Sequence, residues 1–160
     1  MLEIVNTTAL KKLNNLINSY VGKVRLNGIV ASKPHYRILV VDDERDITSV
    51  IKKGLQSKGF KVDVFNNPIE ALANFKAGLY DLLILDIKMP QMNGFELYKE
   101  MKKIDYKVKI CFLTAFEIYY NEFRRVFPKV NVRCFAHKPI SIEKLANIIK
   151  EELESSTSSA

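Results

Sequence analysis

Between residues 37 and 154 the chain alternates short apolar runs with longer segments in which apolar residues recur every three or four positions. The short runs are rich in Val, Ile and Leu and predict β-strands, whereas the longer segments predict amphipathic helices. Strands are expected at residues 37–41, 61–65, 82–86, 108–113 and 132–136. This alternation indicates a parallel sheet with helices on both of its faces.

Capping residues flank several of the predicted helices. Asn67 and Pro68 are suited to begin the helix after the second strand, and Ser141 is suited to begin the last helix. Gly59 and Gly78 are expected to end the helices that precede them.

The smallest common fold with this pattern is the flavodoxin-like (βα)5 three-layer sandwich. Its five parallel strands have the order 2-1-3-4-5, so the first and third strands are neighbours. The strand at residues 82–86 is apolar throughout, which indicates burial on both faces. The strand at residues 61–65 alternates apolar and polar residues, as an edge strand does. A helix at about residues 117–127 is expected to connect the fourth and fifth strands.

Residues 1–36 precede this pattern and are expected to form an N-terminal extension, followed by the folded domain at residues 37–154. Apolar residues at spacings of three and four predict an amphipathic helix at about residues 8–20, and a linker follows at residues 31–35. Two interpretations of this helix stay open, namely packing on the main domain or a role in dimerisation or docking. The small, polar residues 155–160 are expected to be a disordered tail.

The composition is ordinary for a soluble globular protein, with 160 residues, 48% of them hydrophobic and 27% charged. No apolar run has the length of a membrane span and the N-terminus lacks a signal-peptide core, so we expect a cytoplasmic protein. Cys111 and Cys134 fall in the fourth and fifth predicted strands. Two cysteines make neither a disulfide framework nor a zinc site, so buried reduced thiols are expected.

The formal net charge is +7, and residues 1–36 carry +4 of it. A basic protein attracts acidic partners. Nucleic-acid binding is nevertheless not expected, because no dense run of Lys and Arg with interleaved aromatic residues is present.

Polar side chains follow four of the predicted strands at their carboxyl ends. They are, in chain order, Asp42, Asp43, Asp86, Thr114 and Lys138. In the strand order 2-1-3-4-5 they converge at one edge of the sheet, where open α/β sheets place their chemistry. Clustered carboxylates require a cation or a proton, and oxygen ligands select a hard ion such as Mg²⁺. A nearby ammonium and hydroxyl suit phosphoryl oxygens, so the sequence predicts a phosphoryl-transfer site with a carboxylate as acceptor.

Across about residues 36–154 the chain resembles the receiver (REC) domain of two-component response regulators. Four motifs carry the resemblance, and together, in this order and at strand ends, they are highly specific. They are VVDDE at residues 40–44, DIKMPQMNG at residues 86–94, LTA at residues 113–115 and KP at residues 138–139.

The resemblance implies a phosphoacceptor role for Asp86, which would attack the phosphohistidine of a sensor histidine kinase or phosphotransfer protein. It implies Mg²⁺ (or Mn²⁺) held by Asp42, Asp43, Asp86 and the main-chain carbonyl of Lys88. Lys138 would pair with a phosphoryl oxygen. Such a domain is not an enzyme acting on a separate substrate; it assists its own phosphorylation and dephosphorylation.

The resemblance also implies a switch. Thr114 would move to hydrogen-bond the phosphoryl group, and Phe135 would follow as the aromatic switch residue. The peptide bond between Lys138 and Pro139 is expected to be cis. The readout face would consist of the fourth helix, fifth strand and fifth helix. It would bind a downstream protein target, and a homodimer through this face or through the N-terminal helix is a further option.

Three other functions fit these residues less well. A phosphorylation-independent pseudo-receiver, acting as a protein-interaction module, would lack a residue of the acidic pocket, and none is lost here. A dehalogenase-like phosphatase needs a carboxylate where this chain has Lys88, and a flavodoxin needs a Ser/Thr/Gly-rich loop after the first strand. His35 and His137 are not expected to be ligands or phosphodonors. No residues remain after the last helix for an output domain, so a stand-alone receiver is expected.

Two residues lie where a water molecule must pass to attack the phosphoryl group. Lys88 follows Asp86 by two positions, and Phe116 follows Thr114 by two positions. A long cation and a bulky ring hinder such a water molecule, so we hypothesise a longer-lived phosphoryl group than in receivers with small or acidic residues there.

Overall fold

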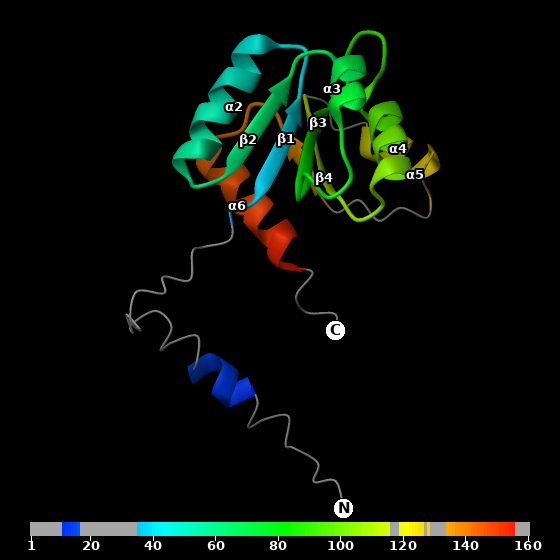
Figure 1. The fold of residues 1–160 in the computed structure, drawn as a ribbon. Coiled ribbons are helices and arrows are strands. Elements are labelled where there is room, and N and C mark those ends of the chain that lie inside the picture. The colour runs from blue at the N-terminus through cyan, green and yellow to red at the C-terminus, as the bar shows by residue number, and fades with distance from the viewer. Residues whose placement is uncertain (1–10, 17–34, 116–118, 127, 129–133, 156–160) are drawn as a thin grey trace, which may run out of the picture. The chain divides into compact units, whose positions relative to one another are not determined.

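The computed structural model describes residues 11–16, 35–115, 119–126, 128 and 134–155. The chain divides into two units, Met1–Pro34 and His35–Ala160, each of which is described by itself. In the first unit, residues 11–16 form a helical segment with exposed side chains (blue in Figure 1). The rest of the predicted helix at residues 8–20, the predicted linker apart from His35 and the predicted tail apart from Ser155 lie outside the described residues. Ser155 is the C-cap residue of the last helix, α6 (Ile142–Glu154), rather than part of a disordered tail.

The second unit contains a five-stranded parallel sheet with the strand order β2-β1-β3-β4-β5 (Figure 1). The strands are β1 (Arg37–Val41), β2 (Lys61–Phe65), β3 (Leu82–Asp86), β4 (Lys109–Thr114) and β5 (Cys134–His137). The predicted flavodoxin-like order is therefore confirmed, and β2 is an edge strand as expected. Three strand bounds shift by one residue, since β4 begins at Lys109 and extends to Thr114, and the described part of β5 extends to His137.

Helices on both faces complete three layers. They are α2 (Arg45–Ser57), α3 (Pro68–Asn74), α4 (Gly94–Ile104), α5 (Tyr119–Val126) and α6 (Ile142–Glu154). Successive strand side chains point to opposite faces. One apolar cluster accordingly joins the sheet to α2 and α6, and a second joins it to α3 and α4. All five residues of β3 are buried, as their continuous apolar pattern predicted. The predicted helix at residues 117–127 is described only as α5.

The predicted N-terminal caps are present. The side chain of Asn67 accepts hydrogen bonds from the backbone amides of Ile69 and Glu70, and Ser141 accepts one from Lys144. At the other end of α2, Gly59 has a φ of +93°, a left-handed conformation that costs glycine little. Gly59 therefore ends α2 as predicted.

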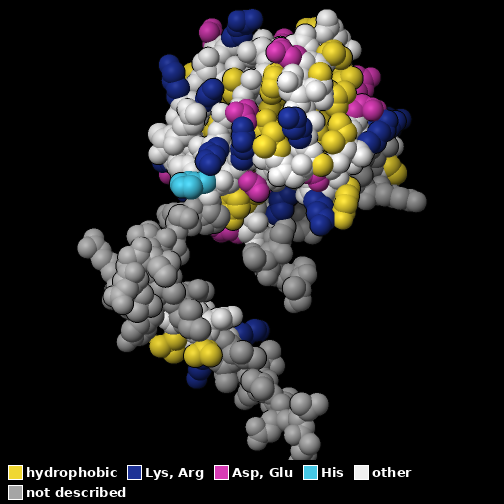
Figure 2. Space-filling view, viewed as in Figure 1, with side chains coloured by type: hydrophobic (Ala, Val, Ile, Leu, Met, Phe, Trp, Pro, Cys, Tyr) yellow, Lys and Arg dark blue, Asp and Glu magenta, His cyan; other side chains and the backbone are white. Residues whose placement is uncertain are grey.

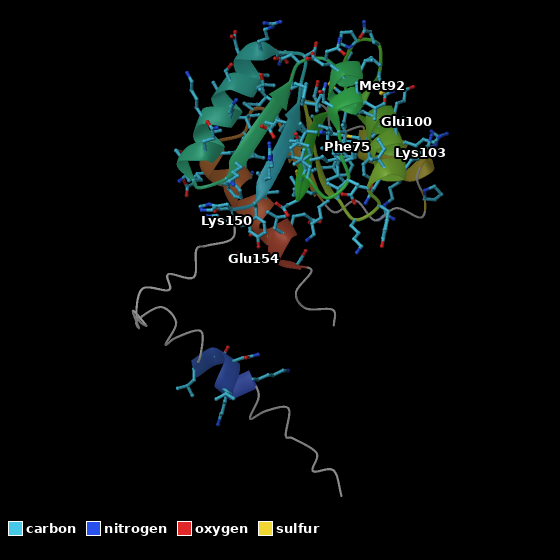
Figure 3. All side chains as sticks on the ribbon, viewed as in Figure 1. Phe75, Met92, Glu100, Lys103, Lys150 and Glu154 are labelled. Carbon is cyan, nitrogen blue, oxygen red and sulfur yellow. A yellow bond between two sulfur atoms is a disulfide. The ribbon has the colours of Figure 1, made fainter. Side chains whose placement is uncertain are left out.

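The predicted end of α3 was wrong. The helix ends at Asn74, and Phe75 adopts an extended conformation, so Gly78 lies in the turn that follows. The extended backbone buries the ring of Phe75 and stacks it on Tyr80, with ring centroids 6.0 Å apart. In Figure 3 Phe75 lies inside the domain, whereas Glu100 and Lys103 project from α4. The free energy gained by burying this ring exceeds the free energy gained by adding one more turn of helix.

The expectation of two reduced thiols was also wrong. The structure joins Cys111 of β4 and Cys134 of β5 in a disulfide. The two residues are register partners on neighbouring strands, with Cα atoms 4.5 Å apart, a separation within the range that a disulfide bridges. Both side chains are buried as predicted. Strand register brings them opposite each other, and the sequence pattern does not specify register between strands this far apart along the chain.

Charged side chains lie among hydrophobic ones on the face of the domain shown in Figure 2. Basic and acidic residues are interspersed on the face shown in Figure 2 rather than gathered in a single patch. In the described part of the chain, no helix has the length and apolar character that crossing a membrane requires.

Candidate functional site

Buried polar residues of the described chain gather at the carboxyl ends of the strands. In the described residues four polar or charged side chains are buried; Asp42, Asp86 and Thr114 lie at this edge, and the fourth, Thr48, lies in α2. Asp42 follows β1 directly, Asp86 ends β3 and Thr114 ends β4. Burying a polar group without a partner is costly, so their concentration at one edge indicates a built site rather than a solvated turn.

Three carboxylates form a cluster at this edge. Oxygen atoms of Asp42, Asp43 and Asp86 lie within 4.8 Å of one another. Asp42 and Asp86 are buried, whereas Asp43 is exposed. This all-oxygen donor set fits a hard divalent cation such as Mg²⁺, which is bound by one or two carboxylates and completes its octahedron with water and phosphate oxygens.

Lys138 supplies a positive charge to the cluster. Its ammonium nitrogen lies 2.7 Å from Oδ2 of Asp42, 3.5 Å from Oδ1 of Asp86 and 3.5 Å from Oε1 of Glu44. The backbone amide of Lys138 donates a hydrogen bond to the carbonyl oxygen of Thr114 at 2.8 Å. The peptide bond between Lys138 and Pro139 is cis, as expected. The hydrogen bonding between β4 and β5 therefore continues to Lys138, one residue beyond the end of β5. It places the ammonium of Lys138 beside the carboxylates.

Electrostatic perturbations mark Asp86 and Lys138. Burial, together with the charges of Asp42 and Asp43, raises the pKa of Asp86 to about 6, and Lys138 opposes this rise. Burial by itself would lower the pKa of Lys138, but its hydrogen bond and charge interaction with Asp42 and the charges of Asp86 and Glu44 raise it. Strongly perturbed groups with a specific charge partner are typical of functional sites.

A tight loop after β3 closes against Asp86. The backbone amide of Gly94 donates a hydrogen bond to the carbonyl oxygen of Ile87 at 2.8 Å. A Cβ atom on Gly94 would collide with the carbonyl oxygen of Asp86, so no other residue fits without a shift. Asn93 and Glu96 form a reciprocal capping box at the start of α4, with both hydrogen bonds at 2.9 Å. These contacts connect the loop to the end of β3 and to the start of α4.

Two residues that support Asp42 were missed in the sequence. The side-chain amide of Asn66 donates hydrogen bonds to the carbonyl oxygen of Asp42 at 2.8 Å and to Oγ1 of Thr48 at 2.9 Å. Oδ1 of Asp42 accepts a further hydrogen bond from the backbone amide of Glu44 at 2.9 Å. The one available signal was Thr48, a polar residue on the inner face of an amphipathic helix.

The other predicted residues lie around this centre. Phe135 packs against Phe112 of β4, with ring centroids 5.4 Å apart, and is half-buried. Lys88 lies in the loop after β3 and is exposed. Phe116 falls outside the described residues. The structure thus brings Asp42, Asp43, Asp86 and Lys138 together, whereas Phe135 lies in β5 and contacts β4.

This arrangement suits phosphoryl chemistry. A carboxylate oxygen of Asp86 is available as a nucleophile, the ammonium of Lys138 can pair with phosphoryl oxygens, and three carboxylates can hold a divalent cation.

Comparison with known proteins agrees with this geometry. A match to the response regulator receiver domain covers residues 38–150. The chain is 34% identical over 79 residues to the transcriptional regulatory protein PcoR of Escherichia coli, covering 49% of this chain and 35% of PcoR. It is 31% identical over 119 residues to the probable transcriptional regulator ycf29 of Porphyra purpurea, covering 72% of this chain and 55% of that protein. The match thus spans only about a third of PcoR and about half of ycf29.

Solved structures show the same fold. A CheY-like receiver domain protein of Methanospirillum hungatei has a TM-score of 0.69 and 27% identity, covering 78% of this chain and 98% of that one. The response regulator TrrA of Thermotoga maritima, solved in complex with Mg²⁺-BeF, has a TM-score of 0.63 and 36% identity, covering 72% of this chain and 97% of that one. Because the family match extends over most of the chain and includes the whole acidic cluster and Lys138, this chain belongs to the receiver domains of two-component response regulators.

Proposed function

We propose that Asp86 accepts a phosphoryl group from the phosphohistidine of a sensor histidine kinase or phosphotransfer protein. A carboxylate oxygen of Asp86 attacks phosphorus, the bond between phosphorus and the imidazole nitrogen breaks, and the electron pair stays on the imidazole. The observation that carries this proposal is the position of Asp86, buried between two further carboxylates and 3.5 Å from the ammonium of Lys138.

Asp42, Asp43 and Asp86, with the main-chain carbonyl of Lys88, would hold Mg²⁺ (or Mn²⁺). When bound, the ion supplies positive charge that offsets the carboxylates and the phosphoryl oxygens. Support comes from the all-oxygen donor set and from TrrA, which was solved with Mg²⁺-BeF. Lys138 would pair with one phosphoryl oxygen and so stabilise the charge that remains after transfer.

The phosphorylated state would be read out by a change at β4 and β5. Thr114 would hydrogen-bond the phosphoryl group, and Phe135 would follow it, changing the face formed by α5, β5 and α6. This face would bind a downstream protein target, or a second copy of the chain. The domain would act as a phosphoacceptor that assists its own phosphorylation and dephosphorylation, without a separate substrate.

Incubation with Mg²⁺ and acetyl phosphate, followed by intact mass measurement, tests the proposal. Wild type should gain the mass of one phosphoryl group, and Asp86→Ala should gain none. Glu100→Ala is a matched control, because it removes a carboxylate that pairs with Lys103 on the surface of α4; this variant should behave like wild type. The gain should vanish when Mg²⁺ is removed. A folded wild type that gains no mass would instead favour a phosphorylation-independent interaction module.

A further inference from the structure

A covalent bond joins the two strands nearest the proposed switch. Cys111 lies in β4 and Cys134 in β5, and the two are direct register partners. Among the strands of the described residues β5 is at an edge of the sheet and pairs with β4 alone. The disulfide therefore adds a covalent bond to the pairing between β4 and β5.

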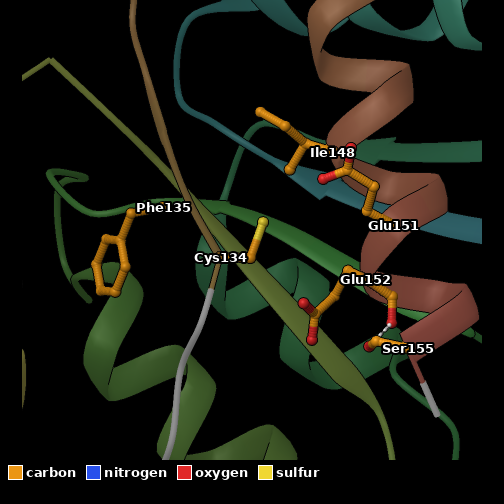
Figure 4. Close-up of a pocket in the computed structure, with 6 residues that line it drawn as sticks. All are labelled: Cys134, Phe135, Ile148, Glu151, Glu152 and Ser155. Atoms are coloured by element: carbon orange, nitrogen blue, oxygen red, sulfur yellow. Dashed lines mark hydrogen bonds between the residues drawn. The ribbon is translucent and has the colours of Figure 1, made fainter. Parts of the chain in front are cut away.

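The disulfide lies next in register to residues that the proposed function uses. The register pair after the cysteines is Phe112 and Phe135, whose rings are in contact. Two pairs later the ladder reaches Thr114, whose carbonyl oxygen accepts the hydrogen bond from the amide of Lys138. Cys134 and Phe135 point to opposite sides of β5 in Figure 4. A displacement of β5 relative to β4 would therefore act on the disulfide as well as on Phe135.

One sulfur of the bond faces a surface pocket. The pocket has a volume of about 380 Å³ and is lined by Cys134, Phe135, Ile148, Glu151, Glu152 and Ser155 (Figure 4). Cys134 is 5% exposed, whereas Cys111 is completely buried. A volume of this size admits a small thiol. Exchange depends on access to a sulfur atom, so attack would occur at Cys134 with Cys111 as the leaving group.

The charge of the pocket selects among thiols. The side chains of Glu151 and Glu152 line it, and the ammonium of Lys109 donates hydrogen bonds to the main-chain carbonyl oxygens of Glu152 and Leu153. The attacking species in disulfide exchange is an anionic thiolate. Two carboxylates repel a thiolate that carries a further negative charge and attract one that carries an ammonium group. Cationic thiols should consequently react faster than anionic ones.

We propose that Cys111–Cys134 is a thiol-exchangeable disulfide that limits the movement of β5 against β4. The thiolate of a first thiol bonds to Sγ of Cys134, the bond between the cysteines breaks, and Cys111 leaves as a thiolate that takes up a proton. A second thiol attacks the added sulfur of the mixed disulfide and releases Cys134 as a thiol together with the oxidised small-molecule disulfide. The bond and its reduction are independent of phosphorylation, whereas any effect on signalling rests on the proposed function of Asp86.

Chemical reduction of the native wild-type protein is the first test. After incubation with a thiol, the protein is denatured in maleimide without further reductant and its intact mass is measured. Untreated protein should take up no maleimide and thiol-treated protein should take up two. At equal thiolate concentration, cysteamine should react at least about three-fold faster than 3-mercaptopropionate, and added salt should narrow the difference. Two maleimides on untreated protein, no reduction before unfolding, or equal rates for both thiols would overturn the proposal.

Hydrogen exchange measured by mass spectrometry tests the restraint on β5. In reduced wild type, amides of the peptide containing β5 should exchange at least about five-fold faster than in oxidised wild type, while the peptide containing β1 serves as an internal control. The Cys111→Ala/Cys134→Ala variant should exchange as fast as reduced wild type. Reduced wild type tests the restraint even if this variant does not fold. Equal exchange rates of the β5 amides in oxidised and reduced protein would overturn the proposal that the disulfide restrains β5. Absence of phosphorylation in both forms would count against the function of Asp86 alone.

Discussion

The ammonium nitrogen of Lys138 lies 2.7 Å from Oδ2 of Asp42, so an ion pair joins the end of β5 to the end of β1 although β3 and β4 separate these strands. The carboxylate side chain is 1% exposed and the lysine side chain 15% exposed. Because both side chains are largely shielded from solvent, removal of one partner leaves a buried charge without a compensating charge.

Lys138→Met should therefore destabilise the domain. We expect the free energy of unfolding to fall by about 2–4 kcal/mol in buffer without divalent cations, because Asp42 and Asp86 lose the ammonium beside them. Denaturant unfolding measures the change. Lys103→Met is the control: it breaks an exposed pair with Glu100 and should cost less than about 1 kcal/mol. Equal losses in the two variants would contradict the importance of the buried pair.

Asp86 should make stability fall as pH rises. Its pKa in the folded state is about 6 and its ordinary value is 3.8, so the folded protein binds the proton more tightly than the unfolded chain. Without Mg²⁺, the free energy of unfolding should decrease between these two pH values and stay lowered at pH 7. Asp86→Asn should remove this contribution and stabilise the domain at pH 7 by about 1–3 kcal/mol, whereas Glu100→Gln should not.

Addition of Mg²⁺ should reverse the order of stability of wild type and Asp86→Asn. An ion that binds only the folded state raises the free energy of unfolding by an amount that grows with the logarithm of its concentration relative to its Kd. Wild type offers three clustered carboxylates and Asp86→Asn offers two, so the increase should be larger for wild type. Thermal melts over a Mg²⁺ titration measure it, and parallel titration curves would argue against Asp86 as a ligand.

Lys88→Asn should shorten the life of the phosphorylated protein. Lys88 is exposed two residues after Asp86, where its long cationic side chain would obstruct an attacking water molecule. Loss of the phosphoryl group, followed by intact mass after removal of the phosphodonor, should be about three-fold faster or more, equivalent to about 0.7 kcal/mol of activation free energy. Lys99→Asn, at an exposed position of α4, should leave the rate unchanged. Phe116→Glu tests the second position, and unchanged rates in both variants would discard the hypothesis.

Gly94→Ala should disturb the site through the backbone. The added Cβ atom would collide with the carbonyl oxygen of Asp86, so either the loop or the end of β3 must move. We expect a loss of about 2 kcal/mol or more in the free energy of unfolding, with weaker Mg²⁺ binding. Gly59→Ala is matched, because its added Cβ atom meets no atom within 4 Å and costs only the strain of a positive φ, about 1 kcal/mol. Unaltered Mg²⁺ affinity in Gly94→Ala would contradict the prediction.

The sequence alone determined the fold and the centre of the site. Apolar runs that end on Asp42, Asp86, Thr114 and Lys138 specify parallel strands whose carboxyl ends meet, and this holds whatever the detailed packing. Local signals also sufficed for the caps, because Asn67 and Ser141 bond to amides two or three residues away.

Only the tertiary structure decided what depends on register and packing. The disulfide between Cys111 and Cys134 requires the two residues to be opposite on neighbouring strands, although 23 residues separate them along the chain. The end of α3 depends on the ring of Phe75 reaching Tyr80, and the support of Asp42 depends on Asn66 arriving from another strand end. These contacts join residues that are far apart along the chain. Their formation depends on where the folded chain places both partners, and residue propensity and hydrophobic periodicity carry no information about that placement.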